Sequence, residues 1–431
     1  MKNYWESSVF CARPFFSIVV DSDASFRFCC ESITNIKEKS EKINQYLITK
    51  NFIKDVWNSL EEQTIRQKLI DEIWPESCFR CSNFKGTTGA RLNIPINNSY
   101  PSKKISLDNL KFIEFRFSNL CNLACRMCNP GCSNMLYDEW NDMIASNSWS
   151  KQNLSILTEE GKKTHNVNWM KNNFARENII DFLKHTTHKI TFNFHGGEPT
   201  INEDMYELLN LCIEENFSHR INLSYNTNLT ILPKKLIEYW KKFDRIILRV
   251  SIDGYEKIND YIRWPSKWSK IISNLEEVKK LSNVDVIITH TVSAYNIMSI
   301  VDFFNWTTEQ NLKIGGSLRS LITGSISEEY LCNILHQPEI LNIKVLPKKM
   351  KDSITNKLMQ FLQEHNKKNN VELQSILTII KYMNSDDWSH LFVDFLKFTA
   401  HMDKTRNQNI MNIMPELNML KINRIHSTAT L

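Results

Sequence analysis

The sequence predicts an α/β protein whose core is a partial (β/α)6, TIM-like barrel. Short apolar runs that suit strands alternate with amphipathic helical stretches between about residues 106 and 345, a pattern typical of βαβ units with parallel strands. Polar residues follow several of these strands at the point where each one ends. Barrel enzymes place their active sites at this edge of the sheet, so we expect a site built from several strand ends.

Six runs are predicted strands of the core: 112–117, 189–194, 221–225, 245–250, 284–291 and 312–321. Helices are expected from about Ser133, around Met205–Cys212 and along Trp268–Leu281, where apolar residues recur at helical spacing. Residues 146–186 show weak periodicity and are interpreted as an insertion over the active-site face.

The chain divides into three predicted regions: an N-terminal unit at 1–105, the core at 106–345 and a helical region at 346–431. In the first, a strand at 16–20, a turn and a return strand at 26–29 predict a hairpin, and a helix is expected at about 51–73. Pro, Asn and Ser at 92–108 indicate a linker. The helical region is expected to cap the open barrel.

Composition excludes several classes of protein. Of 431 residues, 42% are hydrophobic and 23% charged, as in ordinary soluble domains. No apolar run approaches the roughly 18 residues of a membrane helix, and the N-terminus lacks a signal core, so a cytoplasmic protein without a membrane partner is expected. The net charge of +5 is small and no dense basic block occurs, so a nucleic-acid partner is not expected.

Cysteine usage points to metal chemistry. Nine of the eleven cysteines lie between Cys11 and Cys132, and in a reducing compartment they are metal ligands or buried thiols more often than disulfides. Cys121, Cys125 and Cys128 follow the strand at 112–117. Three thiolates on such a loop can hold three irons of a [4Fe–4S] cluster and leave the fourth open. Zinc is the alternative, through Cys78-x2-Cys81 and Cys125-x2-Cys128, although their separation is long and Cys121 is left over.

The spacing Cys-x3-Cys-x2-Cys in this setting resembles the radical S-adenosylmethionine (radical SAM) superfamily. A second motif agrees: the strand at 189–194 leads into Gly196, Gly197, Glu198 and Pro199, similar to the motif with which this family holds the amino group of methionine. The resemblance implies that Cys121, Cys125 and Cys128 are the catalytic cluster ligands. It also implies S-adenosyl-L-methionine as a cofactor, cleaved reductively to a 5′-deoxyadenosyl radical.

Polar residues at two further strand ends extend the expected cofactor site. Asn226 and Asn228 follow one strand, and Ser251 and Asp253 follow the next; the resemblance implies contacts to the ribose or carboxylate. Helix capping is an equal alternative for Asn228 and Asp253. Arg263 could clamp a carboxylate bidentately or form a surface ion pair.

The N-terminal cysteines form a second expected metal site. Cys11, Cys29, Cys78 and Cys81 resemble the twitch (short SPASM) module, which binds an auxiliary [4Fe–4S] cluster, although here the module precedes the core. Cys29 and Cys30 compete for one position, and the family pattern favours Cys29. A structural zinc ion suits four thiolates equally well. Cys132 is interpreted as a bystander and Cys212 as a core thiol.

The predicted function is that of a radical SAM enzyme, an oxidoreductase that abstracts hydrogen from its substrate. Twitch-bearing relatives often modify peptides or proteins, so a peptide substrate is expected. The alternatives are a small-molecule, sugar or nucleotide modifier, and a zinc-stapled binding protein. The resemblance also implies an electron donor such as flavodoxin or ferredoxin, with the auxiliary cluster relaying electrons.

Overall fold

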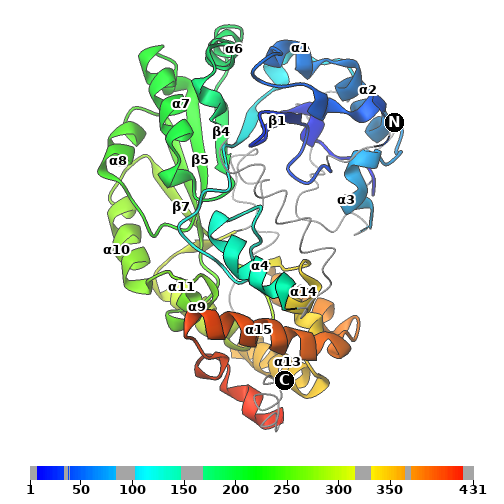
Figure 1. Ribbon diagram of the computed structural model, residues 1–431, viewed down its shortest axis with the longest axis vertical. Helices are drawn as coiled ribbons and strands as arrows, with labels where there is room; N and C mark the ends of the chain where they lie inside the picture. Colours follow the sequence, from blue (N-terminus) through cyan, green and yellow to red (C-terminus); the bar gives the residue numbers. More distant parts are fainter. Residues whose placement is uncertain are drawn as a thin grey trace.

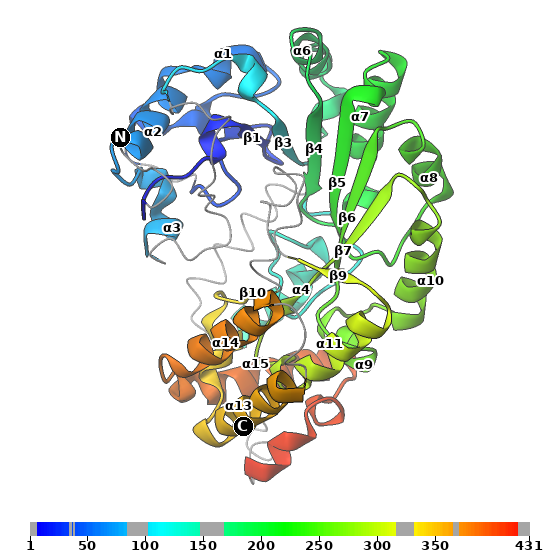
Figure 2. The ribbon, with the colours of Figure 1, turned by 180° about the vertical axis from the view of Figure 1, so that it is seen from behind.

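The computed structural model describes residues 7–33, 37, 39–83, 102–146, 168–315, 332–364 and 370–420. Its centre is an eight-stranded sheet in the order β2-β1-β3-β4-β5-β6-β7-β9 (Figures 1 and 2). These strands are β1 (Ser17–Val20), β2 (Phe26–Arg27), β3 (Phe112–Arg116), β4 (Ile190–His195), β5 (Ile221–Thr227), β6 (Arg245–Ser251), β7 (Val284–Thr289) and β9 (Lys313–Ile314). Every pairing from β1 to β9 is parallel, and only β1 and β2 pair antiparallel. A small parallel pair, β8 (Thr291–Val292) and β10 (Asn333–Ile334), stands apart.

Helices follow the strands in alternation through the core and gather at the C-terminus. They are α1 (Ile53–Trp57), α2 (Leu60–Ile70), α3 (Phe79–Asn83), α4 (Tyr137–Ala145), α6 (Asn173–Lys184), α7 (Glu203–Glu214), α8 (Lys234–Trp240), α9 (Lys257–Ile262), α10 (Trp268–Lys279), α11 (Ile300–Glu309), α13 (Lys348–Glu364), α14 (Asn370–Asn384) and α15 (Phe392–Arg406). Helices α6, α7, α8 and α10 line one face of the sheet (Figure 2).

Alternation along the central strands gives the sheet one aromatic face and one polar face. Phe115 and Phe194 lie on the helix-covered face, where Phe115 packs edge-on against Phe192 at 5.1 Å. Tyr225 packs against Trp240 of α8 at 5.6 Å. The residues between these aromatics, among them Glu114 and Asn193, therefore point to the other face of the sheet.

Most of the predicted strands are confirmed. The strands expected at 112–117, 189–194, 221–225 and 245–250 are β3 to β6, with ends shifted by a residue or two. The run at 284–291 forms β7 as far as Thr289 and then leaves the sheet to begin β8. The sixth predicted strand, 312–321, is seen as the two residues of β9, and the part from 316 onward lies outside the described residues.

Two predictions about helices are wrong. The helix expected at 51–73 is broken into α1 and α2, because Ser59 caps the second helix by accepting a hydrogen bond from the backbone N–H of Glu62. The interpretation of 146–186 as an insertion also fails over its last third: α6 packs beside α7 and α1 as part of the helix layer. Residues 147–167 lie outside the described residues.

The N-terminal hairpin is confirmed, but it is not a separate sheet. Strand β1 pairs in parallel with β3, with Val19 level with Glu114, so one sheet crosses the boundary predicted at residue 105. The return strand β2 ends at Arg27, two residues before Cys29. Of the linker predicted at 92–108, the part up to residue 101 lies outside the described residues.

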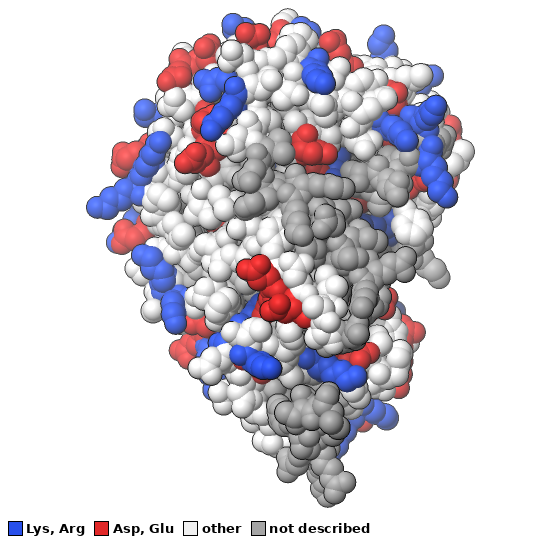
Figure 3. All heavy atoms as spheres, in the orientation of Figure 1, with Lys and Arg blue, Asp and Glu red and all other residues white. Residues whose placement is uncertain are grey.

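The helical region predicted at 346–431 contains α13, α14 and α15. Helix α15 packs against α4, where Arg406 forms a buried ion pair with Glu139 at 2.6 Å. None of the helices in the described ranges has both the length and the apolar character needed to cross a membrane. On the face shown in Figure 3, acidic and basic side chains are interspersed over the described surface.

Candidate active site

The cysteine loop (Cys121–Cys128) leaves the carboxyl end of β3 and is fixed on several sides. The backbone N–H of Cys121 donates to Asn134 Oδ1 at 2.9 Å. The N–H groups of Ala124 and Arg126 donate to the carbonyls of Trp264 and Ile262 at 2.7 and 2.8 Å. Such backbone bonds hold the three thiols at one end of the sheet.

The three thiols differ in their environment. Burial, followed by the charge of Cys125, raises the pKa of Cys121 to about 12. The thiol of Cys128 donates to Cys125, which lowers the pKa of Cys125 and raises that of Cys128. Cys125 is therefore the thiol of the loop that most readily becomes a thiolate, and thiolates are the ligands of iron–sulfur clusters.

Gly196 and Gly197 bring the second motif against the cysteine loop. Both have positive φ, +89° and +56°. A Cβ on Gly197 would lie 2.1 Å from the carbonyl oxygen of Leu120. At this distance the two atoms would overlap, so no residue with a side chain fits. The next residue, Glu198, donates its N–H to the same carbonyl at 2.8 Å. Glycine is thus required here because two backbones touch.

Glu198 is buried, and its carboxylate is turned into the protein. Its oxygens accept from the N–H and Oγ1 of Thr200, from Oγ1 of Thr227 and from the N–H of Asn228. Burial raises the pKa of Glu198, while these hydrogen bonds oppose the rise. The residue ties the end of β4, including Pro199, to the end of β5.

Asn228 links the end of β5 to the cysteine loop. Its Nδ2 donates to Oδ1 of Asn122 at 2.9 Å, and its Oδ1 accepts from Thr230. Asn122 lies inside the Cys-x3-Cys spacing, so the amide positions the loop. Asn226, by contrast, is only half-buried at the same strand end.

Asp253 and Arg263 form a buried pair beside the thiols. Arg263 Nη2 lies 2.6 Å from Asp253 Oδ2, and Asp253 Oδ1 accepts from the N–H of Thr291 at 2.8 Å. Arg263 Nη1 points to Cys125 Sγ at 3.9 Å. The surface ion pair considered for Arg263 is therefore wrong, because its partner is fully buried. Ser251 is half-buried at the end of β6.

The sequence analysis did not predict two residues that hold the cysteine loop in place, Arg126 and Asp403. Arg126, inside Cys-x2-Cys, is fully buried, and its guanidinium stacks 3.7 Å from the ring centroid of Tyr261. Arg126 Nη2 also donates to Asp403 of α15 at 2.6 Å. The charge of Arg126 within an otherwise uncharged motif was the available signal, but nothing in the sequence points to Asp403.

The N-terminal thiols come from three segments of the chain. Burial raises the pKa of Cys78, and the charges of Cys11 and Cys81 raise it further, so these three thiols lie near one another. Buried Arg13 interacts electrostatically with Cys30, Cys29 and Cys11. Cys29 and Cys30 follow the end of β2, and the thiol of Cys30 is hydrogen-bonded to that of Cys29. Both therefore lie near the group formed by Cys11, Cys78 and Cys81.

In the described part of the chain, no three Cys, His, Asp or Glu side chains converge as ligands of one metal ion. A cubic cluster instead takes each thiolate on a different iron. Three other cysteines lie outside these groups: Cys132, Cys212 and Cys332. Cys212 is a core thiol of α7, as predicted, and Cys132 is exposed.

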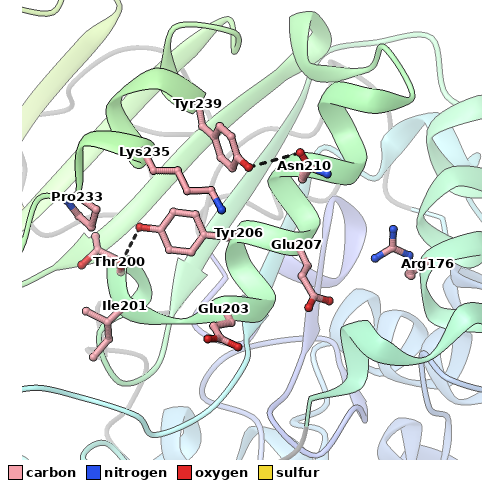
Figure 4. A pocket seen from close by; sticks show the side chains of 10 residues that line it. All are labelled: Arg176, Thr200, Ile201, Glu203, Tyr206, Glu207, Asn210, Pro233, Lys235 and Tyr239. Atoms are coloured by element: carbon pink, nitrogen blue, oxygen red, sulfur yellow. Dashed lines mark hydrogen bonds between the residues drawn. The ribbon is translucent and has the colours of Figure 1, made fainter.

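A surface pocket lies on the helix layer. Its volume is about 650 Å³, and Lys235 lies between the rings of Tyr206 and Tyr239, 5.3 and 5.4 Å from their centroids (Figure 4). Tyr206 donates to the carbonyl of Thr200 at 2.8 Å. None of the predicted site residues lines this pocket.

Comparison with known proteins identifies the core. Residues 115–306 match the family model of the radical SAM superfamily. An uncharacterised protein of Methanocaldococcus jannaschii is 27% identical over 206 residues, 46% of this chain and 59% of the relative. A mycofactocin maturase of Mycobacterium ulcerans is 24% identical over 128 residues, 30% of this chain and 33% of the maturase. The chain thus spans less than two thirds of the length of these relatives.

Solved structures show a weaker likeness. Streptococcus suis SuiB bound to S-adenosylmethionine gives a TM-score of 0.32 at 10% identity, over 83% of this chain and 70% of SuiB. Native anSMEcpe with bound AdoMet and a peptide gives a TM-score of 0.31 at 18% identity, over 47% of this chain and 48% of that protein. The family match, over residues 115–306, shows that this part of the chain is similar to the enzymes of the radical SAM superfamily, and it leaves the reaction open.

Proposed function

We propose that Cys121, Cys125 and Cys128 hold a [4Fe–4S] cluster at which S-adenosylmethionine is bound and reductively cleaved. The observation that carries this proposal is the contact of Gly197 with Leu120. It sets the Gly-Gly-Glu-Pro motif directly against the residue that precedes Cys121. Two motifs about seventy residues apart in the chain thereby share one site.

The residues present fit such a group. The pKa of Cys125 is lowered by its hydrogen bond from Cys128, and Arg263 places a guanidinium beside it, which would offset part of the negative charge of a thiolate-bound cluster. When bound, the cluster supplies the electron that cleaves S-adenosylmethionine to methionine and a 5′-deoxyadenosyl radical, which abstracts hydrogen from the substrate. The protein's part is to orient the bound groups and to exclude water.

Individual residues receive the following roles. Backbone carbonyls of the Gly196–Gly197 turn would accept hydrogen bonds from the methionine amino group, and Glu198 would hold that turn in place through its own hydrogen bonds. Asn226 and Ser251, half-buried at neighbouring strand ends, contact the ribose or carboxylate. Asn228 and Asp253 act indirectly: Asn228 positions the cysteine loop, and Asp253 orients Arg263 for its contact. The parallel strands from β3 to β9 wind as a partial barrel around this site.

We also propose that the N-terminal thiols hold an auxiliary [4Fe–4S] cluster through Cys11, Cys29, Cys78 and Cys81. The electrostatic coupling of Cys78 to Cys11 and Cys81 supports a shared site, and the guanidinium of Arg13 suits an anionic group there. Four thiolates saturate such a cluster, which favours electron relay. A flavodoxin or ferredoxin is the expected external donor.

A peptide or protein is the proposed substrate. The resemblance of the N-terminal cysteines to the twitch module supports this, as does the similarity to proteins named mycofactocin maturases from two mycobacterial species. The similarity to the maturases covers 30% and 26% of this chain, so the substrate is inferred from the class of relative.

The test is anaerobic reconstitution of the full chain, with iron, sulfide and zinc measured alongside 5′-deoxyadenosine formed under dithionite. We expect about eight irons per chain, as two four-iron clusters require, together with cleavage of S-adenosylmethionine. About four irons with cleavage would remove the auxiliary cluster from the proposal. Zinc without iron, or iron without cleavage, would overturn the proposed reaction.

A further inference from the structure

The polar face of the central sheet carries a group of charged side chains that the cofactor site does not use. Strand register places Glu114, Asn193 and Ser224 level with one another on β3, β4 and β5. Two residues further along, Arg116 is level with His195. On the next strand pair, Asn226 is level with Arg249.

These residues form what we call the strand-face site: Glu114, Arg116, Asn193, His195 and Arg249. It lies on the opposite face from the helix layer, at the same strand ends that lead into the cysteine loop and the Gly-Gly turn.

The strand-face site contains two guanidinium groups but only one carboxylate. Glu114 is paired with Arg116, whose Nε lies 3.1 Å from Glu114 Oε1. Arg249 makes no ion pair with any described residue. Its Nη2 donates to the neutral Oδ1 of Asn193 at 3.0 Å, and its Nε has no hydrogen-bond partner within the described ranges. Glu114 acts on Arg249 electrostatically but forms its ion pair with Arg116. A guanidinium that is only 6% exposed is costly to bury without an anion paired directly to it.

His195 adds a second unused donor or acceptor. Its Nδ1 is buried and has no partner among the residues that the structure describes. Burial and the nearby guanidinium of Arg116 lower the pKa of His195 to about 4, so the ring is neutral at pH 7. It therefore adds no positive charge, but it can donate a hydrogen bond.

We propose that the strand-face site binds a carboxylate of the peptide substrate, the side chain of an Asp or Glu residue, through Arg249 and His195, with Arg116 beside them. This inference rests on the proposed function and names the chemistry of its substrate. A carboxylate matches the planar fork of a guanidinium, which can donate two parallel hydrogen bonds. It also supplies an anion paired directly with Arg249, which none of the described residues provides. The acidic residue is then held beside the radical site, so the site selects which part of the peptide is presented.

The experiment uses the full chain with saturating S-adenosylmethionine, so that the cofactor site is filled. Titration calorimetry compares the α-amide of N-acetylglutamate, which carries one side-chain carboxylate, with N-acetylglutamine amide, its neutral isostere. We expect the glutamate compound to bind at least about tenfold more tightly, since a charge-assisted hydrogen bond contributes roughly 1.5–3 kcal/mol. Arg249→Gln should remove this preference, and Arg249→Lys, which keeps the charge without the fork, should retain part of it.

Lys189→Gln is the matched control. Lys189 is an exposed cation just before β4, paired with Asp244, and its loss should leave both dissociation constants unchanged. Equal binding of the two compounds, or an unchanged preference in Arg249→Gln, would overturn the inference. So would tighter binding of inorganic phosphate than of the glutamate compound, or a loss of S-adenosylmethionine affinity in Arg249→Gln without loss of glutamate binding.

The outcomes separate the two proposals. Cleavage of S-adenosylmethionine without the glutamate preference removes this inference and leaves the proposed reaction standing. The glutamate preference without cleavage leaves this inference standing and removes the proposed reaction.

Discussion

The cysteine loop and the N-terminal thiols both gather sulfur atoms, but from very different lengths of chain. The loop takes three thiols from eight consecutive residues, braced by backbone bonds to residues 262 and 264. The N-terminal thiols come from Cys11, from Cys29 and Cys30 after β2, and from the turn that carries Cys78 and Cys81. The second arrangement depends on tertiary contacts, because no short segment holds its thiols together.

Two buried glutamates, one in each region, differ in how well their carboxylates are hydrogen-bonded. Glu198 of the core receives hydrogen bonds from four donor groups. Glu62 of the N-terminal region faces Arg66 at 3.6 Å, and neither of its carboxylate oxygens has a hydrogen bond within the described ranges. The carboxylate of Glu198 is thus fully hydrogen-bonded, whereas that of Glu62 has only an imperfect ion pair. We expect substitutions in the N-terminal region to disturb the core less than substitutions in the core disturb the N-terminal region.

The largest expected effect tests the cysteine loop. Replacing Cys121, Cys125 and Cys128 together by Ala should lower 5′-deoxyadenosine formation to the level without enzyme, because no thiolate remains to hold a cluster. Iron should fall by about four per chain. Cys132→Ala is the control and should keep full cleavage. Persistent cleavage in the triple variant would place the catalytic cluster elsewhere.

The next effect tests the contact between the two motifs of the core. Gly197→Ala places a Cβ on the Leu120 carbonyl in a left-handed conformation, so we expect a loss of about 3 kcal/mol in the free energy of unfolding. Cleavage should also fall. In Gly131→Ala the new Cβ meets only the side chain of Asn129, and denaturant unfolding should change by less than about 1 kcal/mol. Equal stability of the two variants would contradict the docking argument.

A smaller effect separates the two thiol regions. Replacing Cys78 and Cys81 by Ala should remove about four irons per chain while leaving cleavage of S-adenosylmethionine in the absence of substrate unchanged. Cleavage should persist because all three proposed ligands of the catalytic cluster lie in the cysteine loop and none lies in the N-terminal region. Product formation from the true substrate should stop if the auxiliary cluster relays electrons. Unchanged iron content would show that these thiols hold no cluster.

The smallest effect concerns the pH dependence of stability. Burial raises the pKa of Glu62 from 4.5 to about 7, so between these values the folded chain retains a proton that the unfolded chain releases. Stability from this group is therefore lost as the pH rises through that window. From about pH 5 to pH 7.5 the wild type should lose on the order of 1 kcal/mol more than Glu62→Gln in denaturant unfolding. Parallel curves for the two proteins would show that the burial of Glu62 has no such consequence.

Features that depend on residues close together in the chain could be predicted from the sequence. The strands from β3 to β7, the spacing of Cys121, Cys125 and Cys128, and the glycine pair all follow from local pattern and backbone chemistry. Periodicity reports which face of a strand is buried, and a positive φ in a tight turn requires glycine. The helix break at Ser59 also depends on neighbouring residues, but residue type alone does not separate a serine that caps a helix from a serine inside one.

The pairing of residues far apart in the chain could not be predicted and follows from the folded structure. It turned Asp253 towards Arg263 and Glu198 towards Thr200 and Thr227, away from the open contacts expected of them. It recruited Asp403 from the C-terminal helix to hold Arg126, and it joined the N-terminal hairpin to the central sheet. It also left Arg249 without an ion-pair partner among the described residues. Such pairings arise between residues tens to hundreds of positions apart, and burial of a charge selects its partner only once the chain has folded.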